Sequence, residues 1–330
     1  MKTTIFKYII PVFLLAGIVV SCGTETFPEA TVKVPDYTIS TNSLILNTTI
    51  NDLDFIGLDN GFAVGNIVTE TVTQGAVLKT TNGGKDWSRL VIPTLLGQLY
   101  SNYFIDAATG CIVGSLGTIL YTTDAGVTFK QAVSGITETL YGVTFFDKNN
   151  GVCVGAAGVL LTTTNGGVTW TKKVSGVTTD LRAVYMKDAS TIVVCGANGV
   201  LRISNDLAKT WTAIDTKLTI RLQDMHFPVS NIGYACGQSG VVIKIDLSTN
   251  AVTRLILPVD DQQRGIFFVN EKIGYTAGQY GELIKTTDGG ATWKSQNIDP
   301  IAQNMYAIDF PTESKGYIGG VKTFLTSSAK

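Results

Sequence analysis

The sequence predicts an all-β protein, a seven-bladed β-propeller with four-stranded antiparallel blades, over residues 37–330. A glycine recurs with spacings of 49, 41, 41, 41, 41 and 42 residues, which suits a propeller blade and is too long for a leucine-rich repeat. Each unit holds short runs rich in Val, Ile, Phe, Tyr and Thr, which excludes helical repeats. The 35 glycines fit a fold with many tight turns. The marker glycines, one per blade, are Gly65, Gly114, Gly155, Gly196, Gly237, Gly278 and Gly320.

The clearest repeat lies in the middle of the chain and divides into four strands separated by turns. The predicted strands are residues 140–146, 152–155, 159–164 and 169–174. Glycine-containing turns at 156–158 and 165–167 reverse the chain, because glycine adopts backbone conformations that other residues resist.

The last repeat ends with residues 323–330, which supply only a third strand. Residues 37–46 are strand-like and belong to no other repeat. We therefore predict that this N-terminal strand completes the last blade, which joins the first and last repeats and removes an open sheet edge.

The turn between the third and fourth strands carries the most specific motif. In blade 6, residues 286–293 (TTDGGATW) resemble the Asp-box, S/T-x-D-x-G-x-T-W, of BNR-type propellers. The acid or amide accepts backbone N–H groups and the tryptophan packs between strands, so the predicted role is structural, with a catalytic or calcium role as the alternative. The motif positions are Asn82, Asp124, Asn165, Asp206 and Asp288, with Trp87, Trp170, Trp211 and Trp293. Blade 5 has lost the motif, since Leu247 takes the acid position.

The whole repeat, L-x-x-V-x-F…G-x-x-V-G-x-x-G-x-[IL]-x-x-T-[ND]-G-G-x-T-W, resembles the seven-bladed propellers of the photosystem II stability/assembly-factor family. The resemblance covers residues 37–330 and implies an assembly role without chemistry; many relatives are exported bacterial proteins. The family's photosynthetic members depend on a basic patch. Arginines are sparse in this chain, so the resemblance does not imply photosystem binding here.

The first 21 residues are typical of a signal peptide, with Lys2 and Lys7 ahead of the apolar stretch 8–20. The following Val-Val-Ser-Cys resembles a bacterial lipobox, which implies diacylglycerol on Cys22; an ordinary secretory signal with a chance cysteine is the alternative. Residues 22–36 are polar and form the predicted lipidated tether. Gly23 is not the aspartate that retains lipoproteins at the inner membrane, so we expect a lipid-anchored protein of the bacterial cell envelope, at the outer membrane.

Charge and composition exclude several function classes. The formal net charge is −1 and no basic stripe is present, which argues against nucleic-acid binding. The single histidine, His226, excludes a multi-histidine metal site, and no cofactor is predicted. Cys111, Cys153, Cys195 and Cys236 all fall in second strands of neighbouring blades, where we expect buried free thiols rather than disulfides.

An enzyme is the less favoured hypothesis. Asp-boxes also occur in sialidases and xyloglucan-cleaving enzymes, and a glycosidase needs two carboxylates about 5–10 Å apart. Asp52, Asp224 and Asp309 are the candidates, although they form no recurrent pair. His226 shares its repeat position with Tyr103, Thr144, Tyr185 and Phe267, which favours a structural histidine over a catalytic base. A glycan-binding or glycan-cleaving propeller therefore remains the alternative to a binding protein.

The predicted binding site is the mouth of the central channel. Fourteen residues before each marker glycine, the innermost strand carries polar and aromatic residues: Asn51, Tyr100, Tyr141, Arg182, Gln223, Arg264 and Tyr306. Tyr and Arg are favoured in recognition surfaces, so we predict that a protein or peptide partner, or a glycan, binds there. The same pattern would arise if these residues only cap the core. An insertion in blade 1, residues 66–74 with Glu70, lies on the same face and is either a binding loop or an extended hairpin.

Overall fold

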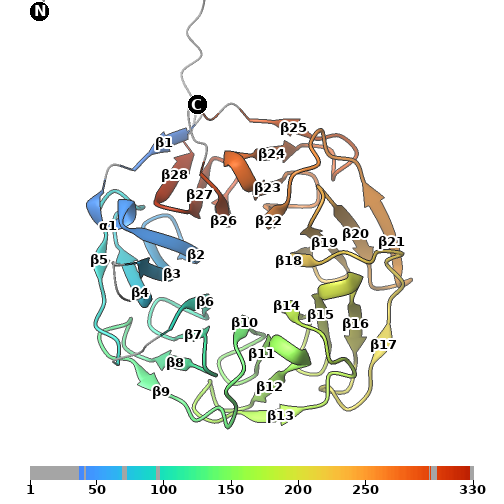
Figure 1. The fold of residues 1–330 in the computed structure, drawn as a ribbon, viewed down its shortest axis with the longest axis horizontal. Coiled ribbons are helices and arrows are strands. Elements are labelled where there is room, and N and C mark those ends of the chain that lie inside the picture. The colour runs from blue at the N-terminus through green and yellow to red at the C-terminus, as the bar shows by residue number, and fades with distance from the viewer. Residues whose placement is uncertain are drawn as a thin grey trace, which may run out of the picture. The chain divides into compact units, whose positions relative to one another are not determined.

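The computed structural model describes residues 37–40, 42–68, 73–93, 97–296, 298 and 303–327. These residues form seven four-stranded antiparallel sheets, arranged as blades around a central opening (Figure 1). The predicted seven-bladed propeller is therefore confirmed. In the described part, no helix is long and apolar enough to cross a membrane. The predicted signal peptide, Cys22 and the tether lie outside the described residues.

In blades 1 to 6 the strands follow one another in the chain, and the first strand borders the opening. Blades 1 to 3 consist of β2 (Thr48–Ile56), β3 (Asn60–Val68), β4 (Thr73–Thr80) and β5 (Ser88–Arg89); β6 (Leu99–Phe104), β7 (Gly110–Gly114), β8 (Ile119–Thr122) and β9 (Lys130–Gln131); and β10 (Leu140–Phe145), β11 (Gly151–Gly155), β12 (Leu160–Thr163) and β13 (Thr171–Lys173).

Blades 4 to 6 have the same strand order. In blades 3, 4 and 6 a short 3-10 turn follows the second strand and reverses the chain direction. Blades 4 to 6 consist of β14 (Leu181–Met186), β15 (Ile192–Gly196), β16 (Leu201–Ser204) and β17 (Thr212–Ala213); β18 (Leu222–Val229), β19 (Ile232–Gly237), β20 (Val242–Asp246) and β21 (Ala251–Leu255); and β22 (Gln263–Phe268), β23 (Gly274–Gly278), β24 (Leu283–Thr286) and β25 (Lys294–Ser295). Blade 7 consists of β26 (Met305–Thr312), β27 (Lys315–Gly320), β28 (Thr323–Ser327) and β1 (Tyr37–Ile39). The turns are η1 (Ala156–Gly158), η2 (Ala197–Gly199) and η3 (Gln279–Gly281).

The ring closes through the N-terminal strand, as predicted. β1 pairs antiparallel with β28, and Tyr37 lies opposite Ser327. The predicted strand over 37–46 is too long, however, because residues 43–46 form the short helix α1 (Ser43–Leu46). Asn42 caps this helix by accepting a hydrogen bond from the Leu44 N–H (3.0 Å), and Ile45 is fully buried in the core between blades 7 and 1. Capping and burial together end the strand at Ile39.

Close backbone approach explains the glycine period. A Cβ added at Gly155 would lie 2.1 Å from the carbonyl oxygen of Thr139, just before the innermost strand of the same blade. At the other six marker glycines a Cβ would meet the corresponding carbonyl oxygen at 1.9 to 2.3 Å. No side chain fits at these distances, so each blade requires glycine at this point.

A phenylalanine–glycine pair packs each blade except the fourth. A Phe of the innermost strand lies over a glycine of the second strand; a Cβ at Gly151 would lie 2.5 Å from the Phe145 ring. In blade 4 the same register pairs Met186 with Ile192. Met186 is smaller and more flexible than the phenylalanine of the other blades, which leaves room for Ile192 in place of glycine. The same volume is filled, but the second strand contributes more of it.

The five Asp-box-like turns are held by the predicted hydrogen bonds. The Asp288 carboxylate accepts from the Thr292 N–H (2.8 Å) and hydroxyl (2.6 Å), and Asp124 and Asp206 do the same for Thr128 and Thr210. Asn82 and Asn165 accept from the equivalent N–H groups. The turn takes Thr169 out of the strand, so β13 is shorter than the predicted strand over 169–174.

Three of the four tryptophans pack as predicted and one does not. Trp87, Trp170 and Trp293 are buried, and each indole N–H donates to the carbonyl of a glycine in its own turn. Trp211 stays partly exposed and donates to the Val174 carbonyl of the preceding blade (2.7 Å). Blade 4 carries the buried Ala208 where the other three turns have that glycine, and the tryptophan takes a different partner.

The four cysteines of the described residues, Cys111, Cys153, Cys195 and Cys236, are buried and free. Cys111 and Cys153 lie in one cluster between blades 2 and 3, while Cys195 and Cys236 lie in two others. Burial raises the pKa of the Cys111 thiol to about 12, so this side chain behaves as a small hydrophobic residue.

Candidate functional site

The central channel contains a cavity of about 470 Å³ that is lined by the innermost strand of every blade. All seven residues of the predicted mouth column line it: Asn51, Tyr100, Tyr141, Arg182, Gln223, Arg264 and Tyr306. They stand at the start of the innermost strands, on the side of the turns η1 to η3, since the Ala156 N–H bonds the Thr139 carbonyl at 2.8 Å. The structure thus brings the column together around one end of the channel.

Aromatic rings and guanidinium groups stack on one another at this mouth. The Tyr100 and Tyr141 rings meet edge to face with centroids 5.3 Å apart, and the Arg182 guanidinium lies 3.8 Å from the Tyr141 centroid. Asp180 accepts a hydrogen bond from Arg182 (3.0 Å) and orients it. We call Tyr100, Tyr141 and Arg182 the mouth ledge. Across the channel the Arg264 guanidinium lies over the Tyr306 ring at 4.9 Å.

Not all predicted site residues are available for binding. The Asn51 amide donates to the Asn66 side chain (3.0 Å) and to the Leu99 carbonyl (2.7 Å), so it links blades 1 and 2. The described ends of the blade 1 insertion extend the β3–β4 pairing, with Asn66 opposite Gly75 and Ile67 opposite Gln74. Glu70 lies outside the described residues.

Below the mouth, the channel wall is acidic. Each of four aspartates accepts a backbone N–H from the innermost strand of the next blade: Asp52 from Asn102 (2.9 Å), Asp54 from Phe104 (2.5 Å), Asp224 from Ile266 (2.9 Å) and Asp309 from Phe55 (2.7 Å). An innermost strand has no further strand beside it, so these N–H groups would otherwise lack an acceptor. Asp309 makes this contact between the last and first blades and so helps to close the ring.

Burial changes the charge of these carboxyl groups. It raises the pKa of Asp52, Asp54 and Asp309 to about 7 and also raises that of Asp224. The neighbouring charge of Asp309 raises the pKa of Asp54 further. Near neutral pH Asp52, Asp54 and Asp309 are therefore partly protonated, in contrast to an ordinary surface aspartate.

His226 takes part in the same pattern. Its Nδ1 accepts from the Phe268 N–H (3.2 Å) of the next blade, and its ring stacks on Phe267 with centroids 4.2 Å apart. Burial lowers its pKa to about 4, so the side chain is neutral at physiological pH. These contacts support the predicted structural role over that of a catalytic base.

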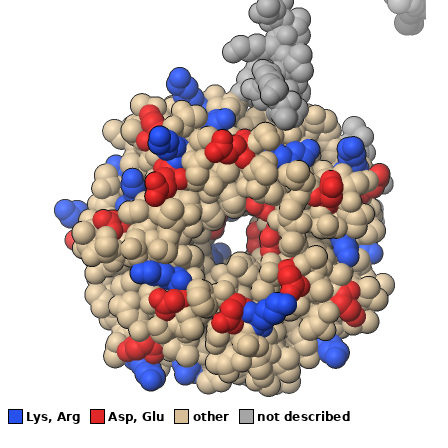
Figure 2. Space-filling view, turned by 180° about the vertical axis from the view of Figure 1, so that it is seen from behind, with Lys and Arg blue, Asp and Glu red and all other residues tan. Residues whose placement is uncertain are grey.

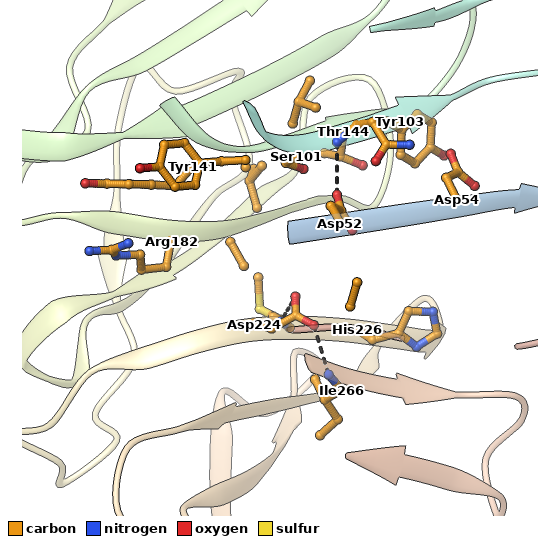
Figure 3. Close-up of a pocket in the computed structure, with 18 of the residues that line it drawn as sticks. Asp52, Asp54, Ser101, Tyr103, Tyr141, Thr144, Arg182, Asp224, His226 and Ile266 are labelled. Carbon is orange, nitrogen blue, oxygen red and sulfur yellow. Dashed lines mark hydrogen bonds between the residues drawn. The ribbon is translucent and has the colours of Figure 1, made fainter. Parts of the chain in front are cut away.

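The side chains form three levels along the channel (Figure 3). Tyr141 and Arg182 lie at one end, Asp52, Ser101 and Asp224 in the middle, and Asp54 and His226 towards the other end (Figure 3). Seen from behind, the channel is an open hole with acidic side chains on part of its wall (Figure 2). At the mouth, tyrosine rings and arginine guanidinium groups offer stacking surfaces and positive charge for an anionic ligand group. Further in, the carboxyl groups offer acceptors for cations or hydrogen-bond donors.

Sequence analysis identified Asp52, Asp224 and Asp309 but missed Asp54. The signal was available in the repeat alignment, 13 and 11 residues before each marker glycine. Those two columns hold all four aspartates and His226, while the single column between them, 12 residues before each marker glycine, is apolar except for Asn102. Read as one alternating strand, they predict a polar face along the channel.

No protein-family model and no curated protein sequence matches this chain. A structure of YCF48 bound to D1 peptide matches with a TM-score of 0.71 and 19% identity, over 89% of this chain and 95% of that one. YCF48 from Cyanidioschyzon merolae matches with a TM-score of 0.71 and 17% identity, over 88% and 98%. The GH74 xyloglucanase from Xanthomonas campestris gives 0.67 and 12%, over 88% of this chain and 53% of its own. At these identities the similarity is one of fold: this chain shares a propeller with a peptide-bound protein and with a glycosidase.

Proposed function

We propose that this protein is a non-enzymatic envelope lipoprotein whose propeller binds a protein or peptide partner, in an assembly or scaffold role. The mouth ledge is the observation that carries this proposal. Stacked, half-buried tyrosine and arginine side chains present planar surfaces at little entropic cost, as binding hot spots do. The fold shared with peptide-bound YCF48 supports a peptide over other ligands.

The site is tested with a displayed random-peptide library on the wild-type protein and on the Tyr141→Ala/Arg182→Ala/Arg264→Ala variant. Selected peptides should bind the variant more weakly by several kcal/mol, on the order of 2 kcal/mol for each hot-spot residue. The melting temperature should change little, since surface substitutions usually cost under about 0.5 kcal/mol each.

The matched control is Lys148→Ala/Asn149→Ala at the other end of the channel. Residues 147–150 lie beside an Asp-box-like turn, where the Gly166 N–H bonds the Asn149 carbonyl (3.0 Å). This variant should bind like the wild type. Loss of binding in the control, with normal binding in the triple variant, would place the functional face at the Asp-box-like turns instead.

Cleavage or binding of a glycan is the second candidate function. Asp52 and Asp224 stand on facing strands with raised pKa values, as a general acid requires, and tyrosines lie at the mouth. Against it, both carboxylates already accept backbone N–H groups of the next blade. Release of reducing sugar from xyloglucan oligosaccharides that is abolished in Asp52→Asn or Asp224→Asn would favour this candidate.

The envelope location is carried by the lipobox-like segment ahead of Cys22. Cys22→Ala should prevent acylation and release the protein from membranes. A Cys22→Ala protein that still partitions completely with membranes would contradict the lipoprotein proposal.

A further inference from the structure

Above about pH 7, where Asp52, Asp54 and Asp309 are mostly ionised, the channel carries more negative charge than its own residues compensate. Asp52, Asp54, Asp224 and Asp309 all line the cavity. In the described part of the chain the ion pairs are Lys148–Asp106 and Arg182–Asp180, so none of the four carboxylates has a cationic partner. A cation that entered the channel would meet carboxylate oxygens from three blades.

Asn102 supplies an independent observation. It also lines the cavity, at a position where the other six blades have apolar residues: Leu53, Val143, Val184, Met225, Ile266 and Ile308. Its residue is only 5% exposed, and neither its amide oxygen nor its amide nitrogen has a hydrogen-bond partner. Its backbone N–H is held by Asp52, which places it directly beside that carboxylate. A buried amide without partners is costly, which indicates that a ligand or water completes it.

Further unpartnered atoms surround the same cavity. Of the eight buried side-chain polar atoms without partners in the described residues, five belong to Asn102, Arg182, Gln223 and Arg264, which all line it. Unsatisfied groups are thus concentrated in the channel rather than spread over the fold.

The chemistry of the lining selects the kind of cation. Among the described residues, no three His, Cys, Asp or Glu side chains are arranged to hold a metal ion. Carboxylates, an amide oxygen and the Ser101 and Thr144 hydroxyls instead offer separate acceptors, and a primary ammonium carries three N–H donors. Val143, Val184 and Met225 line the same cavity and provide apolar contact for an alkyl chain.

We propose that the channel is a subsite for an alkylammonium group, bound between Asp52 and Asp224 with the Asn102 amide oxygen as a further acceptor. The favoured source is the lysine side chain of a peptide held at the mouth ledge; in that form the proposal rests on the proposed function. A free amine carries the same chemistry and is distinguished by the experiment.

The test is calorimetric titration of the protein with 1,5-diaminopentane and, separately, with the blocked tripeptide acetyl-Gly-Lys-Gly-amide. Both should bind, and the variant Asn102→Val should bind each at least about tenfold more weakly. Valine occurs at this position in blades 3 and 4, and it removes two unpartnered atoms, so the variant should melt at an equal or higher temperature. Weaker binding together with undiminished stability separates a ligand-binding role from a structural one.

The second variant is Asp52→Asn/Asp224→Asn, which keeps an oxygen to accept the backbone N–H groups and removes both charges. It should abolish measurable amine binding. The control is Asp124→Asn in an Asp-box-like turn, because Asn82 and Asn165 accept the equivalent backbone N–H groups in blades 1 and 3. This variant should bind like the wild type. No heat with either probe in the wild type, or equal affinity in the wild type and in Asn102→Val, overturns the proposal.

Two further comparisons distinguish the sources. Tighter binding of the tripeptide than of the diamine supports the lysine source, whereas binding of the diamine alone overturns it in favour of a free amine. The mouth variant Tyr141→Ala/Arg182→Ala/Arg264→Ala should still bind the diamine while losing the selected library peptides. If the library peptides bind normally but neither amine binds, the subsite fails and the proposed function stands; the reverse result rejects the mouth site alone.

Discussion

The Asp-box-like turns and the channel wall use the same side chain for the same hydrogen bond, with opposite electrostatic results. In the turns, Asp124, Asp206 and Asp288 accept from a residue four positions along the chain and lie in solvent, and these bonds lower their pKa to about 2. In the wall, aspartates accept from a neighbouring blade, and burial raises the pKa of three of them to about 7.

The difference shows what each contact does for the fold. A turn aspartate stabilises its own blade, and five blades repeat it because the local sequence contains everything it needs. A wall aspartate joins two blades and occurs only in blades 1, 5 and 7. There the closed ring places its carboxylate oxygen beside a backbone N–H group of the next blade. Charge is well solvated in the first region and poorly solvated in the second.

The largest expected effect is on the pH dependence of stability. Asp52, Asp54 and Asp309 have folded pKa values of about 7 against an ordinary 3.8, so the native state binds more protons than the unfolded state in between. Their contribution is fully present below about pH 4, and the free energy of unfolding should fall by several kcal/mol as the pH rises to about 7, at about 1.4 kcal/mol per pKa unit. Urea denaturation across this range measures it.

Two variants sharpen that result. Asp52→Asn/Asp54→Asn/Asp309→Asn should flatten the slope, and an unchanged slope would show that the wall is not its origin. His226 acts in the opposite direction: its pKa is lowered from 6.5 to about 4, so its contribution is present above 6.5 and lost as the pH falls to 4. His226→Phe should therefore steepen the slope in that window.

Ring closure is tested next by Asp309→Ala. The Phe55 N–H would lose its acceptor within the buried wall, which should cost about 1–3 kcal/mol of the free energy of unfolding. The measurement is best made below about pH 4, where the carboxyl group is protonated in both the folded and the unfolded state, so that its ionisation does not enter the comparison. Asp309→Asn keeps an acceptor and should be close to the wild type. Equal effects of the two substitutions would contradict the inter-blade role.

Packing inside a blade offers a comparable but local test. Met186→Phe would give blade 4 the phenylalanine of the other blades, but Ile192 stands where they have glycine. Overpacking should destabilise the protein by about 1–3 kcal/mol. Ile192→Gly introduced together with Met186→Phe should recover part of this loss in a double-mutant cycle. Additive effects would mean that the two positions do not share volume.

The smallest effects belong to the turns. Asp288→Ala should lower the urea midpoint by less than Asp309→Ala does, because water can satisfy the exposed N–H of Thr292. Asp124→Asn should leave the midpoint unchanged, since Asn165 makes the same contact with Thr169 (3.0 Å). Peptide binding should be normal in both variants. A turn variant with normal stability but no binding would move the functional surface to this side of the propeller.

Features written in the local sequence were predictable. The marker glycines reveal the number of blades because each one lies against a carbonyl oxygen of its own blade, where no side chain fits. The turn motif follows from hydrogen bonds between residues four positions apart. Ring closure was also predictable, since the last repeat lacks a strand and an open edge is unfavourable. The Asn42 cap that ends β1 and the altered partner of Trp211 were not, because both depend on a few neighbouring atoms rather than on the repeat.

The contacts within the channel were decided by the closed ring rather than by the local sequence. The repeat columns identified the mouth residues as polar and aromatic. They could not show that Arg182 stacks on Tyr141 of the preceding blade, or that the Asn51 amide donates a hydrogen bond to the Leu99 carbonyl of blade 2. Nor could they show that aspartates far apart in the chain meet in one poorly solvated wall, where burial shifts their protonation towards neutral pH. Local contacts need only the residues that make them, whereas contacts between blades exist only after seven sheets have closed into a ring.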